Sequence, residues 1–371
     1  MKKIPVNKDE VFYQLALSKI DNIGVMSVKK LINHFGTARE VFNLSTRELM
    51  QVQGMSLVRA QAIAAHSDFG DVEKDFEFAE RKGIEIISFQ DRNYPNRLTH
   101  CADGPVVLFK KGPADLSAKR IVSIVGTRKI TEYGMKVTRE LVESMLPYNI
   151  TVVSGLAYGV DIQAHQACLE LGLPTVAVLA HGLDKVYPNS HTRHANEMAE
   201  KGALLTEFGI NTIPDRENFP KRNRIVAGMT DATIVVESGL SGGSMITANL
   251  AAGYYRDVFA IPGRVHDSKS DGCNRLIKSN KAALLESAKD LEYIMGWTKS
   301  EQAKPVQTKI FIDLKPEEEK LLNCLREKGK TQIDELSLAT ALPMSMVMVH
   351  LLTLELNGLV RSLPGKVYEV C

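Results

Sequence analysis

The sequence predicts an α/β protein with a parallel-rich sheet, preceded by a helical domain and followed by a small winged helix. From residue 121 onward, short β-branched runs alternate with helix-like stretches, which is the pattern of a parallel sheet. Before residue 80, apolar residues recur at helical spacing. After a polar stretch near residue 300, the chain ends in helical segments followed by two short strand-like runs.

The length and composition of the chain exclude several classes of protein. With 371 residues, 44% of them hydrophobic, the chain is long enough for two or three domains and is too apolar to be disordered. It has no apolar run of membrane-spanning length and no signal-peptide pattern at Met1, so we expect a cytoplasmic protein without membrane contact. Its five cysteines are scattered without CxxC spacing, so we expect neither a disulfide framework nor a metal site. The net charge of +2 does not indicate any particular partner. If the protein binds nucleic acid, its basic residues must therefore be concentrated in one part of the surface.

Residues 1–80 are predicted to form a helical domain with two helix–turn–helix units, whose turns lie at 20–24 and 52–56. The units resemble the helix-hairpin-helix pattern, in which glycine amides hold a DNA backbone. The first turn has Asn22 and Gly24, and the second has Gly54 and Ser56, so each lacks one of the two expected glycines. Because a lost glycine hinders close approach to a phosphate, we expect packing rather than DNA contact here.

Residues 81–298 are predicted to form the sheet domain. Runs at 84–89 and 106–109 are expected as edge strands. The main strands are predicted at residues 121–125, 151–153, 175–179, 203–206, 233–236 and 258–261. In such a sheet, ligands bind beyond the carboxyl ends of the strands, so the residues that follow each strand are the candidates for a site.

The first strand is followed by Gly126, Thr127 and Arg128, and then by a helical pattern over 131–145. We expect this turn to leave backbone N–H groups unpaired, to allow close approach at Gly126, and to add a hydroxyl and a guanidinium. That combination suits a phosphate. The second strand leads to Ser154 and Gly155.

Two later segments add to the predicted site. Phe219-Pro220-Lys221-Arg222-Asn223-Arg224 has three cations and no acid, and we interpret it as a shaped loop with a ring for stacking a base beside charges for phosphates. A segment rich in small residues follows the fifth strand and contains Ser241, Gly242, Gly243 and Ser244.

Asp161 and His165 lie four residues apart on one predicted helix. A general acid–base pair is conceivable. We favour a structural interpretation, in which Asp161 caps amides near the helix start and His165 packs beneath the loop.

Several enzymatic patterns fit poorly. Gly126 is followed next by Gly134, so a GxGxxG fingerprint is missing, as is GxxxxGK[ST]; we expect no nucleotide cofactor. The run from Gly239 to Gly243 has GxSxG spacing around Ser241, with Asp257 and His266 in triad order. Asp257 precedes its strand, whereas a triad acid lies beyond one, so a serine hydrolase is disfavoured.

Six blocks within residues 121–285 resemble, in order, those of the DNA-processing protein A family, also called Smf: VGTR, SGLAYGVDIQAH, GLDKVYP, FPKRNRIVAG, SGGSMITANLA and IPG. The resemblance implies an extended Rossmann-like domain that binds single-stranded DNA, loads a RecA-type recombinase during natural transformation, forms a homodimer and has no catalytic activity. It implies phosphate contacts from Arg128 and residues 221–224. The implied pocket is completed by Gly126, Thr127, Ser154, Gly155 and residues 241–244.

The chain's last part is predicted as a linker over 299–310 and a winged helix over 311–371. Its would-be reading helix, 345–357, contains Glu355 but no Lys or Arg. We therefore expect it to pack or to face a protein rather than DNA.

Two other functions stay open at this stage. A nucleotide hydrolase or phosphoribohydrolase would use the same pocket, since the Gly242-Gly243 turn is similar to that of such enzymes. Those enzymes need a carboxylate just past the turn, where this chain has Thr247, Ala248 and Asn249. The second of these functions is that of a pure protein–protein adaptor.

Overall fold

The structure is a computed structural model that describes residues 7–298, 315–357, 359–363 and 366–370. The chain divides into two compact units, residues 1–300 and 301–371, and each is described by itself. The predicted linker at 299–310 lies outside the described residues. The domain boundaries drawn from the sequence stay predictions.

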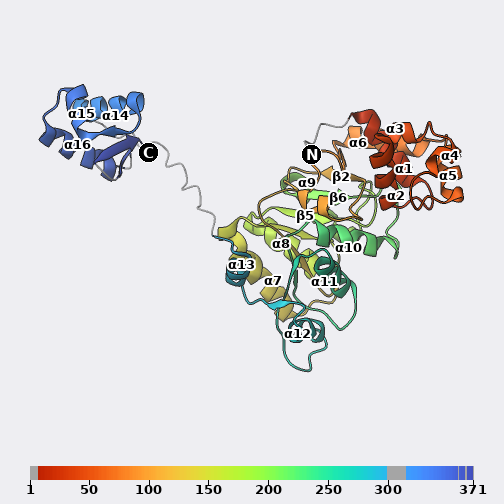
Figure 1. Ribbon diagram of the computed structural model, residues 1–371. Helices are drawn as coiled ribbons and strands as arrows, with labels where there is room; N and C mark the ends of the chain where they lie inside the picture. The colour runs from red at the N-terminus through yellow and green to blue at the C-terminus, as the bar shows by residue number, and fades with distance from the viewer. Residues whose placement is uncertain (1–6, 299–314, 358, 364–365, 371) are drawn as a thin grey trace. The chain divides into compact units, whose positions relative to one another are not determined.

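The first unit begins with a cluster of helices, coloured red to orange in Figure 1. They pack around a core that includes Leu15, Leu31 and Ile63. The turn between the first two helices places Asn22 in the left-handed region at φ 64°, and the second predicted turn places Gly54 at φ 87°. Both predicted breaks are therefore real turns. The helices are α1 Lys8–Lys19, α2 Val25–Phe35, α3 Ala38–Val41, α4 Thr46–Leu49, α5 Leu57–Ala64 and α6 Gly70–Lys82.

A mixed sheet forms the centre of this unit. Among the described residues it has nine strands in the order β1-β2-β6-β5-β4-β3-β7-β8-β9. β1 pairs antiparallel with β2 and β2 with β6, whereas every other pairing is parallel, as the sequence predicted. The strands are β1 Glu85–Ser88, β2 Val107–Lys111, β3 Ile121–Val125, β4 Thr151–Ser154, β5 Thr175–Val178, β6 Ala203–Thr206, β7 Ala232–Val235, β8 Asp257–Ala260 and β9 Ala283–Leu284.

Helices cover both faces of the sheet (Figure 1). On one face, α7, α8 and α13 pack against side chains such as Val122 and Ile234. On the other face, α10, α11 and α12 pack against side chains such as Val125 and Val176. The helices are α7 Glu132–Met145, α8 Val160–Leu171, α9 Thr192–Lys201, α10 Asn218–Gly228, α11 Gly243–Gly253, α12 Asp271–Lys278 and α13 Ala288–Met295, with short 3-10 turns η1 Asn96–His100, η2 Leu146–Tyr148 and η3 Asn189–His191.

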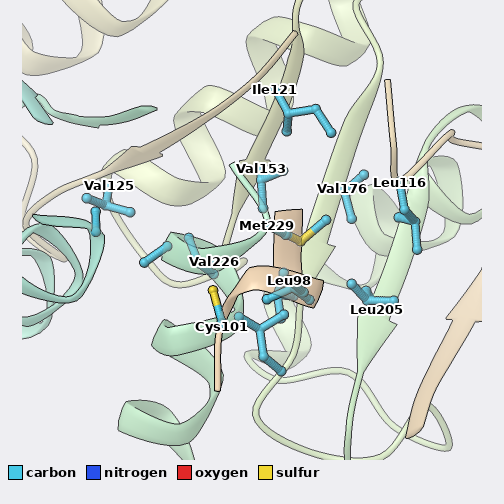
Figure 2. Close-up of a cluster of buried hydrophobic side chains, with 14 of the residues drawn as sticks. Leu98, Cys101, Leu116, Ile121, Val125, Val153, Val176, Leu205, Val226 and Met229 are labelled. Carbon is cyan, nitrogen blue, oxygen red and sulfur yellow. The ribbon is translucent and has the colours of Figure 1, made fainter. Parts of the chain in front are cut away.

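Figure 2 shows how α10 is fixed to the sheet. Val226 of α10 and Met229, which caps the end of that helix, lie among strand residues that include Val153, and Leu98 of η1 closes the cluster. Each of these four side chains is at most 1% exposed. Burying such residues contributes about 1.5–3 kcal/mol each, so the helix that carries several predicted site residues is held rigidly.

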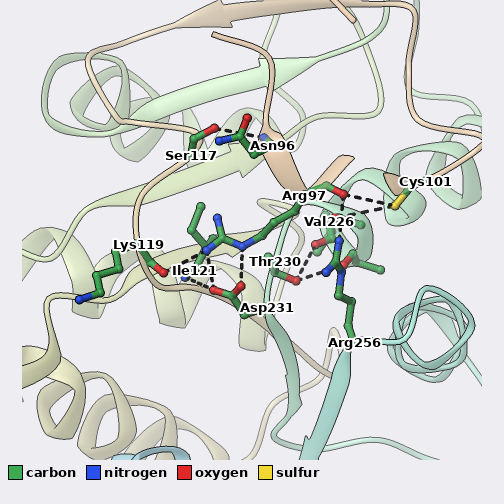
Figure 3. A network of polar contacts seen from close by, with 12 residues as sticks. Asn96, Arg97, Cys101, Ser117, Lys119, Ile121, Val226, Thr230, Asp231 and Arg256 are labelled. Carbon is green, nitrogen blue, oxygen red and sulfur yellow. Dashed lines mark hydrogen bonds and ion pairs between the residues drawn. The ribbon is translucent and has the colours of Figure 1, made fainter. Parts of the chain in front are cut away.

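The amino ends of β3 and β7 are closed by an ion pair, shown in Figure 3. Arg97 binds Asp231 through two parallel bonds, Nε to Oδ1 at 2.6 Å and Nη2 to Oδ2 at 2.7 Å. Asp231 also accepts the Ile121 N–H at 2.9 Å, and Arg97 donates to the Lys119 carbonyl at 3.1 Å. This network ties η1 to the starts of two central strands.

The second unit has the predicted winged-helix pattern. Its elements are α14 Pro316–Lys328, β10 Thr331–Gln332, α15 Ile333–Thr340, α16 Met344–Leu356, β11 Val360–Leu363 and β12 Val367–Val370. In the described part of the chain, no single helix is long and apolar enough to cross a membrane. The bent pair Ile333–Thr340 and Met344–Glu355, at 109°, passes that test only when taken together.

Candidate nucleic-acid interface

A cavity of about 350 Å³ opens at the carboxyl ends of the central strands, where the sequence predicted the site. We call it the central cavity. The loops after β3, β4 and β7 and the first turns of α10 and α11 form its walls. The predicted residues that line it are Gly126, Thr127, Arg128, Asp161, Phe219, Arg222, Asn223, Ser241, Gly242, Gly243 and Ser244. Ser154, Gly155, His165, Lys221 and Arg224 were also predicted and do not line it.

The segment predicted as a loop at 219–224 is instead the beginning of a helix, α10. Pro220 occupies the first helical turn, where its missing N–H has no intrahelical partner to lose. Phe219, Arg222, Asn223 and Val226 have the spacing i, i+3, i+4 and i+7, which places them on one face of the helix, toward the central cavity. The side chains of the remaining cations point elsewhere.

Arg222 is the buried cation of the central cavity, with 5% of its surface exposed. Its guanidinium lies directly against Gly155, because a Cβ at Gly155 would be 1.1 Å from Arg222 Nη1. Nη1 donates to the Val178 carbonyl at 3.4 Å, and the buried Nε has no hydrogen-bond partner in the region the structure describes. Burial lowers the pKa of Arg222. One buried donor of this arginine, Nε, is therefore left without a partner next to the cavity.

Asp161 is the anion that faces Arg222, with 3.9 Å between its Oδ2 and Arg222 Nη1. The same oxygen accepts the Gly155 N–H at 3.1 Å and the Ala157 N–H at 3.4 Å. Burial raises the pKa of the Asp161 carboxyl, and Arg222 and the two amides oppose that rise. The expected capping role agrees with these contacts. Asp161 holds both the loop after β4 and the arginine that lies on it.

The glycines of the site divide into two groups. A Cβ at Gly126 would lie 2.4 Å from the Val160 side chain, so the close approach predicted there is made by α8 and not left for a ligand. Gly242 has φ 137° with no atom within 4 Å of a Cβ, and a Cβ at Gly243 would meet only Asn223, at 3.8 Å. The open glycines thus lie at the start of α11, which no side chain caps among the described residues.

The turn after β3 is less open than the sequence suggested. The Thr127 N–H donates to the Glu237 carbonyl at 2.7 Å, and the Lys129 N–H donates to Thr127 Oγ1 at 3.2 Å. Ser154 is also committed to the protein, since its hydroxyl donates to the Ile124 carbonyl at 2.6 Å. The expectation of unpaired amides is therefore wrong at these two N–H groups. The start of α11 offers amides in their place.

Arg128 and Phe219 meet at the mouth of the central cavity. The Arg128 guanidinium carbon lies 5.1 Å from the centre of the Phe219 ring, a cation–π distance. Arg128 is exposed and Phe219 is partly exposed. The guanidinium thus lies over one face of the Phe219 ring, so a charge and an aromatic side chain meet at the mouth of the cavity.

A small aromatic cleft adjoins this mouth and was not assigned from the sequence. Tyr158 and Tyr187 line it together with Arg128 and Phe219. The two tyrosine side chains are 48% and 44% exposed, and the Tyr187 ring centre lies 6.4 Å from that of Phe219. Both tyrosines follow predicted strands in loops, and that position is the signal that would have identified them.

Lys221 and Arg224 lie on the other side of α10, outside the central cavity. Arg224 forms an ion pair with Glu207 and donates to the Asp103 carbonyl. Burial raises the pKa of Glu207, and Arg224 opposes the rise. The sequence placed all three cations on one rim because it treated the segment as a loop. In a helix, residues two apart in sequence face in different directions.

Two catalytic interpretations do not fit the geometry. His165 is fully buried, its Nδ1 lies 2.7 Å from Thr175 Oγ1, and burial lowers its pKa to about 3. It does not reach the cavity. Asp257 pairs with Ala232 at the amino ends of β8 and β7, whereas Ser241 follows the carboxyl end of β7. Ser241 and Asp257 therefore lie at opposite ends of the strands and cannot form a triad.

Comparison with known proteins places these features in one family. Residues 85–295 match the profile of DNA recombination-mediator protein A, and residues 311–366 match the DprA winged helix domain. Protein Smf of Synechocystis sp. is 30% identical, over 97% of this chain and 98% of the relative.

Among the similar solved structures are two of DNA processing protein A. That of DNA processing protein A from Streptococcus pneumoniae superposes with a TM-score of 0.66 and 31% identity, and covers 78% of this chain and 99% of that one. That of DNA processing protein A from Helicobacter pylori, described for its single-stranded DNA binding mode, has a TM-score of 0.53 and 28% identity. It covers 58% of this chain and 97% of that one.

Proposed function

The chain belongs to the family of DNA recombination-mediator protein A, and from this premise we propose that it binds single-stranded DNA in its central cavity. We infer further that it delivers the strand to a RecA-type recombinase during DNA uptake and recombination, with no catalytic step of its own. The relatives named for DNA processing and the Helicobacter pylori protein described for single-strand binding support this assignment.

The observation that carries the proposal is Arg222 on Gly155. A buried guanidinium with an unpaired Nε costs free energy, and Asp161 approaches it only to 3.9 Å. The cavity wall beside it contains the open amides of α11. Exposed Arg128 and the ring of Phe219 extend the same wall toward solvent. A phosphate in the cavity would thus have a base-stacking surface beside it, which suits a flexible single strand better than a duplex.

The proposed contacts are those of the residues that line the central cavity. Arg128 and Arg222 bind phosphates, the first turn of α11 donates amides, and Phe219 stacks a base. Gly155 and Asp161 act through Arg222 as positioning residues. Because these contacts go to backbone and ring faces, binding should show little sequence preference.

A titration of labelled oligothymidylate against salt tests the proposal. The logarithm of the affinity should fall by about 0.7 per log unit of salt for each phosphate bound, and a duplex of the same length should bind more weakly. Binding of the duplex and the single strand with equal affinity would contradict the assignment.

The enzymatic alternative uses the same cavity and predicts base release from nucleoside monophosphates. Thr247 lines the cavity where such an enzyme needs a carboxylate, and Asp161 is held by Arg222 and two amides. Incubation with nucleoside monophosphates and chromatographic detection of free base decides the question. Base release that disappears in Asp161→Asn would favour the enzyme.

We also infer a homodimer formed through the sheet domain, residues 81–298, as the family resemblance implies. Sedimentation of the full chain tests it, and a monomer at micromolar concentration would contradict it.

A further inference from the structure

Lys221 and Arg224 line a second cavity, of about 630 Å³, on the side of α10 opposite to the central cavity. Its other walls are the turn between α1 and α2 and the segment that follows β6. We call it the hairpin cavity. We propose that the hairpin cavity is a second nucleotide subsite, which receives the DNA strand after it has crossed the first turn of α10. The inference rests on the proposed function, since it requires a strand in the central cavity.

The first turn of α10 is a wall shared by the two cavities. Phe219 and Arg222 face the central cavity, and Lys221 and Arg224 face the hairpin cavity. A helix with its side chains is about 10–12 Å thick, so a strand has only that thickness to cross between the two. Pro220 and Lys221 are exposed on this turn, which leaves the crossing open to solvent.

Lys221 is the cation of the hairpin cavity that is free to meet a phosphate. Arg224 pairs with Glu207, and Lys19 pairs with Asp75 at 2.5 Å, so these two cations neutralise carboxylates of the protein. Lys221 is exposed and has no ion pair among the described residues. An exposed lysine of this kind offers a charge to a passing backbone and little to the fold.

The remaining wall suits a nucleobase. Ile23, Val25, Met26 and Phe208 line the hairpin cavity, and Met26 is 52% exposed. No atom lies within 4 Å of a Cβ built at Gly24, so the hairpin backbone is open to close approach. Apolar side chains beside one free cation give a base and its phosphate separate partners, and the volume lies within the ~300–1,000 Å³ typical of ligand sites.

The test compares oligothymidylates of about 4 and about 16 nucleotides, the span of site sizes in single-strand grooves. Lys221→Gln should weaken binding of the longer strand roughly two- to fivefold and lower its salt slope by about 0.7, while the shorter strand binds as before. Met26→Glu places an anion in the hairpin cavity and should act in the same direction. The matched control is Lys82→Gln, which removes one exposed charge from α6, outside both cavities, and should change neither affinity.

The outcomes separate the two proposals. If Arg128→Ala weakens binding of both strands but Lys221→Gln and Met26→Glu change neither, the hairpin cavity is no subsite and the central assignment stands. If Lys221→Gln weakens both strands equally, Lys221 acts at the central cavity and the inference is wrong. If Arg128→Ala also leaves binding unchanged, the proposed function itself fails.

Discussion

Two arginine–aspartate pairs, one at each end of the central strands, differ in what their donors do. At the amino ends, Arg97 binds Asp231 through two bonds of 2.6 and 2.7 Å and donates to a carbonyl as well. At the carboxyl ends, Arg222 and Asp161 approach only to 3.9 Å, although they are more deeply buried. Burial therefore does not distinguish a structural pair from the pair that we propose to act in binding. The number of donors left unused does.

The two ends also differ in what covers the arginine. Arg97 belongs to η1, which Leu98 of the same turn fixes in the core (Figures 2 and 3). Arg222 lies on bare glycine backbone at Gly155, with a cavity beside it. The first arrangement ties elements together, and the second is the one that we propose to bind a phosphate.

The largest effect is expected at the amino ends. Arg97→Ala leaves Asp231 half-buried without its partner and should lower the free energy of unfolding by about 3 kcal/mol. Single-strand affinity should not change, because the pair lies at the other end of the strands. Urea denaturation and oligonucleotide anisotropy measure the two quantities. A loss of single-strand affinity in a variant that is still folded would contradict the purely structural role of the Arg97–Asp231 pair.

Gly155→Ala should have the next largest effect, and on binding. Its Cβ would lie 1.1 Å from Arg222 Nη1, so the guanidinium must leave its place. Loss of one charge-assisted hydrogen bond of ~1.5–3 kcal/mol corresponds to roughly 10- to 100-fold weaker affinity. Gly253→Ala is the matched control, since no atom lies within 4 Å of that Cβ. Equal affinity in both variants would show that Arg222 does not touch DNA.

A smaller effect, on the pH dependence of stability, is expected for His165, which lies one helical turn from Asp161. Burial lowers the pKa of His165 to about 3, below its value of about 6.5 in an unfolded chain. Its contribution to stability is thus complete above about pH 6.5 and falls by about 1.4 kcal/mol per pH unit below it. Between pH 7 and pH 5, wild-type protein should lose about 2 kcal/mol more than His165→Gln. Parallel urea curves would contradict this structural role.

The smallest effect is expected for Arg128→Ala at the exposed mouth of the central cavity. Affinity should fall roughly two- to fivefold and the salt slope by about 0.7. Because Arg128 is exposed, the free energy of unfolding should stay within about 0.5 kcal/mol of wild type. An unchanged salt slope would remove Arg128 from the set of phosphate contacts.

The fold could be predicted because its signals are local. The strand predicted at 121–125 is the observed Ile121–Val125, and 203–206 is Ala203–Thr206. The short apolar runs and the glycine or polar residues that end them are readable within a few positions. The position of the site followed from the same pattern, since all the loops after parallel strands reach one edge.

The details of the site depend on long-range contacts, which the sequence does not display. Gly126 was interpreted as room for close approach and Gly155 as part of the pocket, but Val160 lies against the first and Arg222 against the second. The ion pair of Arg224 with Glu207 could not be predicted either, because Glu207 lies 17 positions earlier, in the loop after β6. A sequence shows where a side chain is small or charged, and only the fold shows what fills the space around it.

The helical start of α10 makes the order of its residues matter as much as their kinds. Successive side chains on a helix are rotated by about 100°. The order of the residues from Phe219 to Arg224 therefore decides which of the two cavities each cation faces. Exchanging Lys221 with Arg222 would keep composition and net charge, yet it would turn the guanidinium away from Gly155. If the proposed function holds, relatives with the same count of basic residues in a different order should therefore bind DNA along a different path.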